Sequence, residues 1–159
     1  MIYTERLLAL SEYRKLLEEL KAAEQYRDLC RHDLAHFMDV ARIGRVIACE
    51  QNLQLTADDI YLAALLHDVG RMQEYKHGIP HEEAGVNIAT TFLEDIDYPV
   101  SKRNTILAAV AGHRAEKEDE DLLTKVIRTA DKLSRPCFLC KIADECYWPE
   151  ELKNKSFFY

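Results

Sequence analysis

Apolar residues recur at helical spacing along most of the chain. Near its start they mark one face of a helix that is expected to run from Thr4 to about Leu29, with Thr4 as its N-terminal cap; these apolar residues are Leu10, Tyr13, Leu17 and Leu20. No stretch shows the alternation of apolar and polar residues that is typical of a half-buried strand. The pattern therefore predicts an all-α protein.

Capping and helix-breaking residues divide the rest of the chain into further helices. Thr56 opens one of them, with Asp59 three positions later in a variant of the capping box, and Gly70 closes it. Gly78 to Pro80 form a turn, and Pro80 suits the first position of the next helix. These predicted helices cover about residues 32–52, 57–69, 80–96, 99–112 and 122–134.

The pattern predicts one compact helical bundle with three parts. The length of 159 residues corresponds to about one domain. Residues 1–30 form an N-terminal helix that packs on the domain, residues 31–136 form the domain, and residues 137–159 form a tail rich in cysteine and aromatic residues. We expect this less periodic tail to pack across a bundle of about six main helices.

Composition and charge narrow the class of protein. The chain has 21 Lys and Arg residues against 28 Asp and Glu residues, a formal charge of −7, which argues against constitutive binding to long nucleic acids or anionic membranes. A small anionic substrate remains compatible with this charge, because a metal ion can reverse the local field.

The longest apolar run, Ile60 to Leu66, is far too short to span a membrane, and the N-terminus lacks a signal pattern. Five cysteines, an odd number, suit a reducing compartment, so we expect a cytoplasmic protein.

Six polar residues lie on faces that the pattern turns inward. His36, for example, shares a stripe with Val40, and His113 follows Val110 at helical spacing. Burial of an unpaired polar group costs about 2–7 kcal/mol, and burial of a charge costs more. One such histidine would be an ordinary hydrogen-bonded core residue, but convergence on a divalent cation accounts better for six such residues on five different helices. The six are His36, His67, Asp68, His81, His113 and Asp131.

The adjacent pair His67-Asp68 is the sharpest of these features. Neighbouring residues within a helix point about 100° apart, so they share a metal site only near a helix end or where two ions lie side by side. Gly70 supplies such an end. Asp68 could then bridge two ions while His67 binds one of them.

The order and surroundings of these residues resemble the HD superfamily of metal-dependent phosphohydrolases. The resemblance is carried by His36-Phe-Met-Asp-Val-Ala, by Ala64-Leu-Leu-His-Asp-Val-Gly-Arg71 and by Thr129-Ala-Asp-Lys-Leu133, and it covers about residues 30–136. It implies a helical bundle of the HD-domain type and a metal site formed by His36, His67, Asp68 and Asp131.

Two further histidines resemble ligands of the binuclear HD subgroup, which includes bacterial diadenosine-tetraphosphate hydrolases and HD-GYP phosphodiesterases. They occur in His81-Glu-Glu-Ala-Gly85 and in Gly112-His113, although no Gly-Tyr-Pro follows His113. The resemblance implies that His81, His113 and a bridging Asp68 hold a second ion. The expected cofactor is a pair of divalent transition metal ions, chosen among Fe, Mn, Zn, Co and Ni.

The resemblance also implies the chemistry. Metal-activated water would attack phosphorus, with Asp68, Arg71 and Lys132 as catalytic residues and Arg135 as a further candidate for binding phosphoryl oxygens. We expect hydrolysis of a phosphoester or phosphoanhydride bond in a small, nucleotide-like substrate, and a homodimer is left open. Two alternatives stay open: a non-catalytic, metal-stabilised module that binds a nucleotide or a protein, and a diiron centre that activates oxygen.

Several other residues are weaker candidates. His32 lies four positions before His36, a spacing that can chelate on a helix, but the family motif assigns only His36, so His32 is expected to support the site or lie at the surface. His77 is set aside because the His-x3-Gly pattern belongs to His81. Glu82 and Glu83 fall in the first turn of a helix, where the dipole favours carboxylates.

The tail contains two further patterns. Cys137-Phe-Leu-Cys140 and Cys146 resemble part of a zinc or cluster site, but Cys30 and Cys49 are expected on distant helices, which favours free or buried thiols. The aromatic residues are expected to dock on the domain or at a dimer interface, or to stack on a substrate base; they are Tyr147, Trp148, Phe157, Phe158 and Tyr159.

Overall fold

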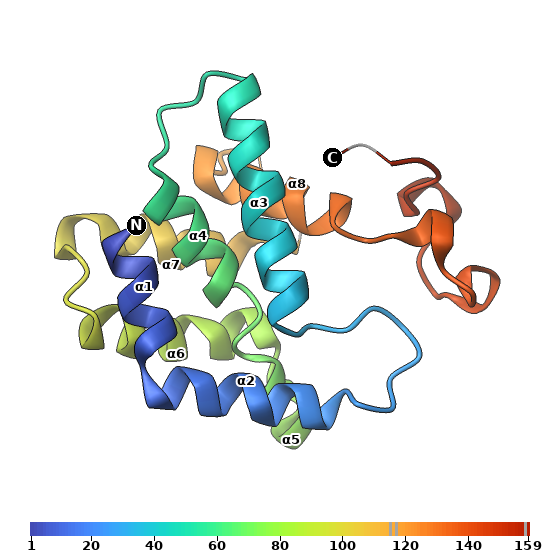
Figure 1. Cartoon of the computed structure of the whole chain (residues 1–159), viewed down its shortest axis with the longest axis horizontal. Helices are drawn as coiled ribbons and strands as arrows, with labels where there is room; N and C mark the ends of the chain where they lie inside the picture. Colours follow the sequence, from blue (N-terminus) through green and yellow to red (C-terminus); the bar gives the residue numbers. More distant parts are fainter. Residues whose placement is uncertain (115, 117, 158) are drawn as a thin grey trace.

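The computed structural model describes residues 1–114, 116, 118–157 and 159. Within them the chain forms eight α-helices and no strand, which confirms the all-α prediction (Figure 1). The helices are α1 (Ile2–Ala9), α2 (Ser11–Ala23), α3 (Leu34–Glu50), α4 (Ala57–Leu66), α5 (Arg71–His77), α6 (His81–Asp95), α7 (Val100–Gly112) and α8 (Leu122–Leu133). Three 3-10 turns follow: η1 (Cys137–Leu139), η2 (Ala143–Glu145) and η3 (Glu150–Leu152). None of the described helices is both long and apolar enough to cross a membrane.

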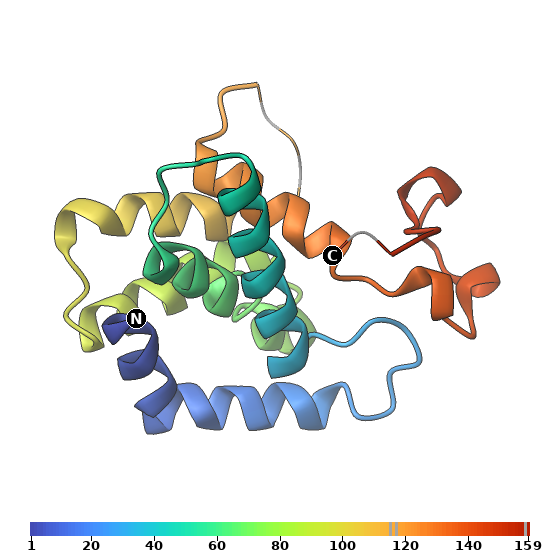
Figure 2. The ribbon, with the colours of Figure 1, turned by 45° about the horizontal axis from the view of Figure 1, so that its top comes forward.

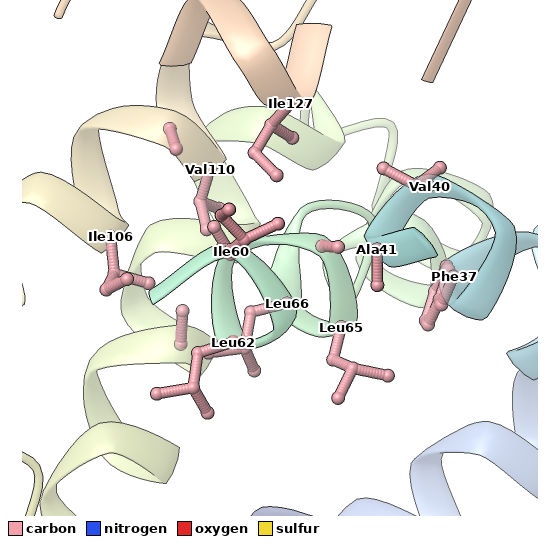
Figure 3. Packing of buried hydrophobic residues seen from close by; sticks show 14 of the residues in the cluster. Phe37, Val40, Ala41, Ile60, Leu62, Leu65, Leu66, Ile106, Val110 and Ile127 are labelled. Atoms are coloured by element: carbon pink, nitrogen blue, oxygen red, sulfur yellow. The ribbon is translucent and has the colours of Figure 1, made fainter. Parts of the chain in front are cut away.

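Helix α4 forms the centre of the bundle. Every residue from Leu62 to Gly70 is buried, so the end of this helix and the turn after it are enclosed by neighbours. Apolar side chains of α3, α7 and α8 cover α4 (Figure 3); they include Phe37, Val40, Ala41, Ile106, Val110 and Ile127. Because each such large side chain contributes about 1.5–3 kcal/mol when buried, this packing fixes the place of the His67-Asp68 turn.

The N-terminal segment forms two helices, so the prediction of one helix over residues 4–29 is wrong. The chain bends at Leu10, whose backbone is extended (φ −64°, ψ 129°). The bend lets Leu7 of α1 and Tyr13 of α2 both enter the core, and the Tyr13 hydroxyl donates to the Leu65 carbonyl over 2.7 Å. Thr4 is not a cap but lies within α1, where its side chain and N–H bind Asp58.

The turn after α4 differs from the predicted helix over residues 57–69. Helix α4 ends at Leu66, and a short turn leads into α5, which the sequence pattern did not predict. Gly70 has a right-handed backbone (φ −75°), so it is not a left-handed C-cap. A Cβ atom there would instead lie 2.0 Å from the His81 carbonyl oxygen and 2.6 Å from the Gly85 nitrogen. Glycine is required because α6 begins against this backbone, which brings His81 beside Asp68.

Other predicted boundaries agree with the structure to within about two residues. Thr56 caps α4 by accepting a hydrogen bond from the Asp59 N–H over 3.1 Å. The Asp59 carboxylate does not return the bond and instead accepts from the Tyr98 hydroxyl. Pro80 comes directly before α6 and is not its first residue.

The C-terminal tail lies at one side of the bundle, beyond the end of α8 (Figures 1 and 2). Asn154 fastens it there, because its side-chain amide donates to the carbonyls of Lys132 and Arg135, each over 2.8 Å. None of the residues in η1, η2 or η3 is buried. Phe158, one of the aromatic residues noted in the sequence, lies outside the described residues.

Candidate metal centre

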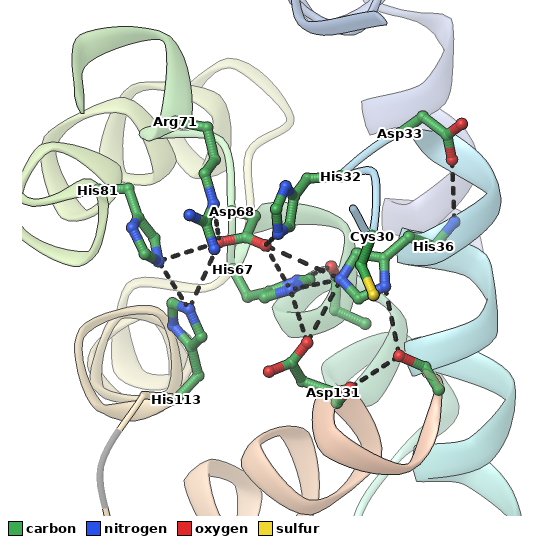
Figure 4. Close-up of polar contacts among 12 residues, drawn as sticks. Cys30, His32, Asp33, His36, His67, Asp68, Arg71, His81, His113 and Asp131 are labelled. Carbon is green, nitrogen blue, oxygen red and sulfur yellow. Dashed lines mark hydrogen bonds and ion pairs between the residues drawn. The ribbon is translucent and has the colours of Figure 1, made fainter. Parts of the chain in front are cut away.

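All six inward-facing polar residues named in the sequence analysis meet in one place (Figure 4). His36 comes from the first turn of α3, His67 and Asp68 from the turn after α4, His81 from the start of α6, His113 from the end of α7, and Asp131 from α8. Five separate segments therefore contribute one or two side chains each.

Four of these residues form a first group. The Nε2 atoms of His36 and His67 lie 3.3 Å apart. Asp68 Oδ2 lies 3.2 Å from His67 Nε2, and Asp131 Oδ1 lies 3.4 Å from His36 Nε2. Two imidazole nitrogens and two carboxylate oxygens thus face a common point.

The second group shares Asp68 with the first. His81 Nε2 and His113 Nε2 lie 3.2 Å apart, and Asp68 Oδ1 is 3.1 Å from the former and 3.5 Å from the latter. Asp68 therefore turns one oxygen toward each group, the geometry of a bridging carboxylate.

Hydrogen bonds fix the tautomer of all four histidines. Each Nδ1 atom faces an acceptor and each Nε2 atom faces the centre, so the Nε2 lone pairs are directed inward. The Nδ1 partners are the Ala64 carbonyl for His67 (2.7 Å), the Val110 carbonyl for His113 (2.8 Å), the Glu74 carboxylate for His81 (3.0 Å) and the Ser134 hydroxyl for His36 (3.3 Å).

This arrangement fits divalent transition metal ions. Two inward lone pairs about 3.2–3.3 Å apart repel each other unless a metal ion or a shared proton lies between them. Two nitrogens bound to one ion at about 2.1 Å are separated by about 3.0 Å in octahedral and about 3.4 Å in tetrahedral geometry. The observed spacing falls in this range, and the mixture of imidazole and carboxylate suits Fe, Mn, Co, Ni or Zn.

The electrostatics favour an ionised Asp68 carboxylate and a neutral His36 imidazole, the forms in which these groups bind metal. Burial opposes ionisation of Asp68, but the facing His67, His113 and His81 imidazoles outweigh it and hold the pKa of Asp68 well below its usual value. Burial, together with the neighbouring His67, lowers the pKa of His36 to about 4. Burial also acts against the His67 cation, but the Asp68 carboxylate more than compensates and raises the pKa of His67. Metal binding there competes with protonation of His67, because both use the Nε2 lone pair.

A cleft of about 340 Å³ opens over the two groups and is rimmed by positive charge. Its cationic lining residues are Arg27, Arg71, Arg114, Lys132 and Arg135, in a chain whose overall charge is −7. Arg71 and Lys132, both predicted from the sequence, are therefore placed where they could contact a bound anion. Arg71 is held by Asp68 (Nε to Oδ1, 3.0 Å).

Arg135 occupies a special position in this lining. Its Nη2 lies 3.2 Å from Asp131 Oδ2, and its guanidinium stacks on Trp148 at 3.8 Å from the ring centroid. Its Nη1 is buried and has no hydrogen-bond partner among the described residues. This donor therefore needs an acceptor that the described residues do not supply.

His32 is closer to the centre than the sequence indicated. Its Nε2 lies 3.9 Å from Asp68 Oδ2, on the cleft wall. Glu24 holds it, because the carboxylate accepts from the His32 N–H (2.6 Å) and faces its Nδ1 (2.7 Å). The Tyr75 hydroxyl also donates to Glu24. Sequence reasoning missed Glu24, since no signal separated it from the exposed carboxylates of the predicted first helix.

The remaining weak candidates lie at the edge of the centre or at the surface. His77 is exposed at the end of α5. Glu82 pairs with Arg114 over 3.1 Å and lies 3.5 Å from His81 Nδ1, while Glu83 is exposed.

Comparisons with known proteins agree with this geometry. The HD domain family matches residues 33–135, a range that contains all six converging residues. An uncharacterized protein of Clostridium beijerinckii is 38% identical over 94% of both chains. Ribonuclease Y of Mycoplasma mycoides subsp. mycoides is 30% identical over 76% of this chain, which spans only 21% of that relative. The crystal structure of a predicted HD superfamily hydrolase from an uncultured Thermotogales bacterium superposes with a TM-score of 0.66 at 24% identity, covering 91% of this chain and 80% of that one.

Proposed function

Because this chain belongs to the HD domain family, we propose that it is a metal-dependent hydrolase that cleaves a phosphoester or phosphoanhydride bond in a small, nucleotide-like substrate. One observation carries the proposal. Two pairs of inward-facing imidazole nitrogens share a single carboxylate, and this unit lies beneath a cleft lined with cationic side chains. Phosphoryl transfer to water needs both features: a place to activate water and positive charge around the phosphoryl oxygens.

We assign His36, His67, Asp68 and Asp131 as ligands of one ion, and His81, His113 and the bridging Asp68 as ligands of the other. Two divalent ions held there would lower the pKa of a water molecule and offset charge on the phosphoryl group. The Nδ1 acceptors orient the ligands, since the carbonyls, Glu74 and Ser134 fix which nitrogen carries the proton. The two groups of ligands favour the binuclear HD subgroup, to which diadenosine-tetraphosphate hydrolases belong.

Three cationic residues would bind the phosphoryl oxygens. Arg71 is oriented by Asp68 and by Glu74, so its guanidinium is held at the edge of the centre. Lys132 lines the same cleft. Arg135 offers the buried Nη1 donor that has no partner among the described residues, and a phosphate oxygen would satisfy it.

His32 would supply a proton to the leaving oxygen. Glu24 holds its Nδ1, and its Nε2 lies beside Asp68 on the cleft wall, within reach of a leaving group bound at the centre. We expect His32→Gln to slow hydrolysis of an alkyl phosphate about 10²-fold or more, while a nitrophenyl phosphate, whose leaving group needs no proton, is affected little. Equal losses with both substrates would remove His32 from this role.

The size and charge of the cleft support a small substrate. A volume of about 340 Å³ is of the order that a small ligand occupies, and the net charge of −7 disfavours a long polyanion. Ribonuclease Y, by its name, acts on RNA, and RNA and nucleotides share the phosphoester bond. Short RNA is therefore the second substrate class to assay.

The experiment is a panel of nucleotides, dinucleoside polyphosphates and short RNAs, each tested with Mn, Fe, Co, Ni, Zn or Mg. We expect phosphate ester or anhydride cleavage by the wild type, a loss of about 10³-fold or more in Asp68→Ala, and normal turnover in His77→Ala, which alters an exposed histidine outside the centre. Equal turnover by wild type and Asp68→Ala would reject the assignment. Substrate loss that requires iron and oxygen, without bond hydrolysis, would assign oxidative chemistry instead.

A further inference from the structure

Four of the five cysteines line a second cavity, of about 290 Å³, beside the candidate metal centre. They are Cys30, Cys137, Cys140 and Cys146. The expectation that Cys30 lies on a distant helix is wrong, because α2 ends at Ala23 and Cys30 lies in the loop before α3. This loop runs toward the tail on the same side of the bundle (Figure 1), and Figure 4 places Cys30 near His36.

The backbone of the tail presents its cysteines at the ends of tight turns. Cys137 begins η1 and Cys140 follows it, with the Cys140 N–H donating to the Cys137 carbonyl over 3.1 Å. Cys146 follows η2 in the same way, donating to the Ala143 carbonyl over 3.3 Å. Two cysteines separated by two residues on a tight turn form a recurrent half-site for metal.

Among its described residues the tail buries too little apolar surface to explain its fixed turns. Several large apolar side chains remain exposed: Phe138 by 39%, Leu139 by 77%, Tyr147 by 71% and Leu152 by 45%. A segment of residues 137–159 that buries so little apolar surface usually needs a covalent or metal cross-link. The thiols are free, so no disulfide supplies it.

Charged side chains of both signs accompany the four thiols. Arg135 and Lys153 line the same cavity, as do Arg31 and the carboxylates of Asp28, Asp33 and Asp39. Lys153 also donates to the Ala143 carbonyl over 2.6 Å, so its ammonium is held against the cysteine-bearing segment. These two cations would offset part of the negative charge of four thiolates.

We propose that Cys30, Cys137, Cys140 and Cys146 bind an iron–sulfur cluster that joins the loop before α3 to the C-terminal tail. Four thiolates from one cavity are the ligand set of such a cluster and of zinc. The sulfurs around one tetrahedral zinc ion lie about 3.8 Å apart. Here the four cysteines line a cavity of about 290 Å³. Space of this size between the thiols favours a cluster over a single ion, because each thiolate of a cluster binds a different iron.

The cluster would also form part of the wall of the candidate active site. Cys30 and Cys146 line the catalytic cleft as well as the cysteine cavity, and Tyr147 and Trp148 follow directly in the cleft lining. Loss of the cluster would therefore make one wall of the cleft mobile, while all six His and Asp ligands would stay in place.

The test is anaerobic purification of the full chain, followed by iron, zinc and acid-labile sulfide analysis and a visible absorption spectrum. We expect about four iron and four sulfide per chain in the cluster. Cys140→Ser should lose the sulfide and the visible absorption, whereas Cys49→Ser, which alters the exposed cysteine on α3, should keep both. Asp68→Ala should keep the sulfide too, which separates this site from the His and Asp centre.

A second measurement needs no variant. Alkylation of the native wild type should label Cys49 and spare the other four cysteines, and removal of metal should expose all five. Stoichiometric zinc without sulfide, lost in Cys140→Ser, would overturn the cluster in favour of a zinc ion. Five reactive cysteines in the native protein, or metal content unchanged by Cys140→Ser, would overturn the site altogether.

Discussion

The helical bundle and the C-terminal tail keep their shapes by different means. In the bundle, α4 is buried on nearly every side, and the polar centre at its end rests on that packing. In the tail, none of the residues of η1, η2 or η3 is buried, and polar contacts such as those of Asn154 hold the segment in place. Rigid helix packing therefore positions the metal-ligand side chains of the bundle, whereas local turns and side-chain hydrogen bonds position the residues of the tail.

The largest effect confined to the bundle is expected when the Asp68 carboxylate, which the two His and Asp groups share, is neutralised. Asp68→Asn should lower turnover about 10³-fold or more and reduce metal at the His and Asp groups, because one anion faces both. Turnover and metal analysis measure this, with Asp95→Asn at the exposed end of α6 as a control. Retention of two divalent ions in Asp68→Asn would contradict the bridging role.

The second test uses the pH dependence of the chelator-treated protein. Burial lowers the folded-state pKa of His36 from 6.5 to about 4, so the unfolded chain binds more protons between these pH values. His36 therefore contributes stability that is present above pH 6.5 and is lost as the pH falls toward 4, by at most about 3 kcal/mol. Urea unfolding at several pH values should show a shallower slope in this window for His36→Asn than for the wild type. An identical slope would show that His36 is not buried in its neutral form.

A third test concerns the close approach at Gly70. Gly70→Ala should destabilise the protein by about 1–3 kcal/mol and weaken metal binding, because the new methyl group would displace the start of α6 and with it His81. Gly78→Ala is the matched change: its backbone is left-handed (φ +69°) but its surroundings are open. It should cost about 1 kcal/mol and leave metal binding unchanged. Equal metal affinity in both variants would mean that Gly70 does not position His81.

The smallest expected effect lies in the tail. Asn154→Ala removes the amide that donates to the carbonyls at the end of α8, at a local cost of about 1 kcal/mol. Hydrogen exchange should speed up in the tail and stay unchanged in α4. Faster exchange throughout the bundle would show that the tail and the bundle unfold as one unit.

The bundle could be predicted from the sequence because the spacing of the apolar residues and the positions of the buried polar residues identify the same inward helix faces. Inward-facing histidines and aspartates at helical spacing indicated both the faces that pack and the place where they meet. The break at Leu10 was hidden, since Leu10 keeps the spacing of Tyr13 and Leu17 across it. Helix α5 has only seven residues, too few for a clear apolar period.

The loop before α3 could not be predicted for a related reason. Residues 24–33 contain no glycine or proline, so the first predicted helix continued to about Leu29, whereas α2 ends at Ala23. The missing helix end concealed both the contact of Glu24 with His32 and the approach of Cys30 to the tail. These contacts depend on where the loop turns in space, which local patterns do not encode.

The central claim is that four inward-directed Nε2 atoms and a shared Asp68 carboxylate hold two divalent ions. Anomalous diffraction from crystals grown with manganese, measured together with the metal content per chain, tests it most directly. Two peaks are expected on opposite sides of the Asp68 carboxylate, one beside His36 and His67 and one beside His81 and His113. No peak, or peaks only at the surface away from these histidines, would contradict it.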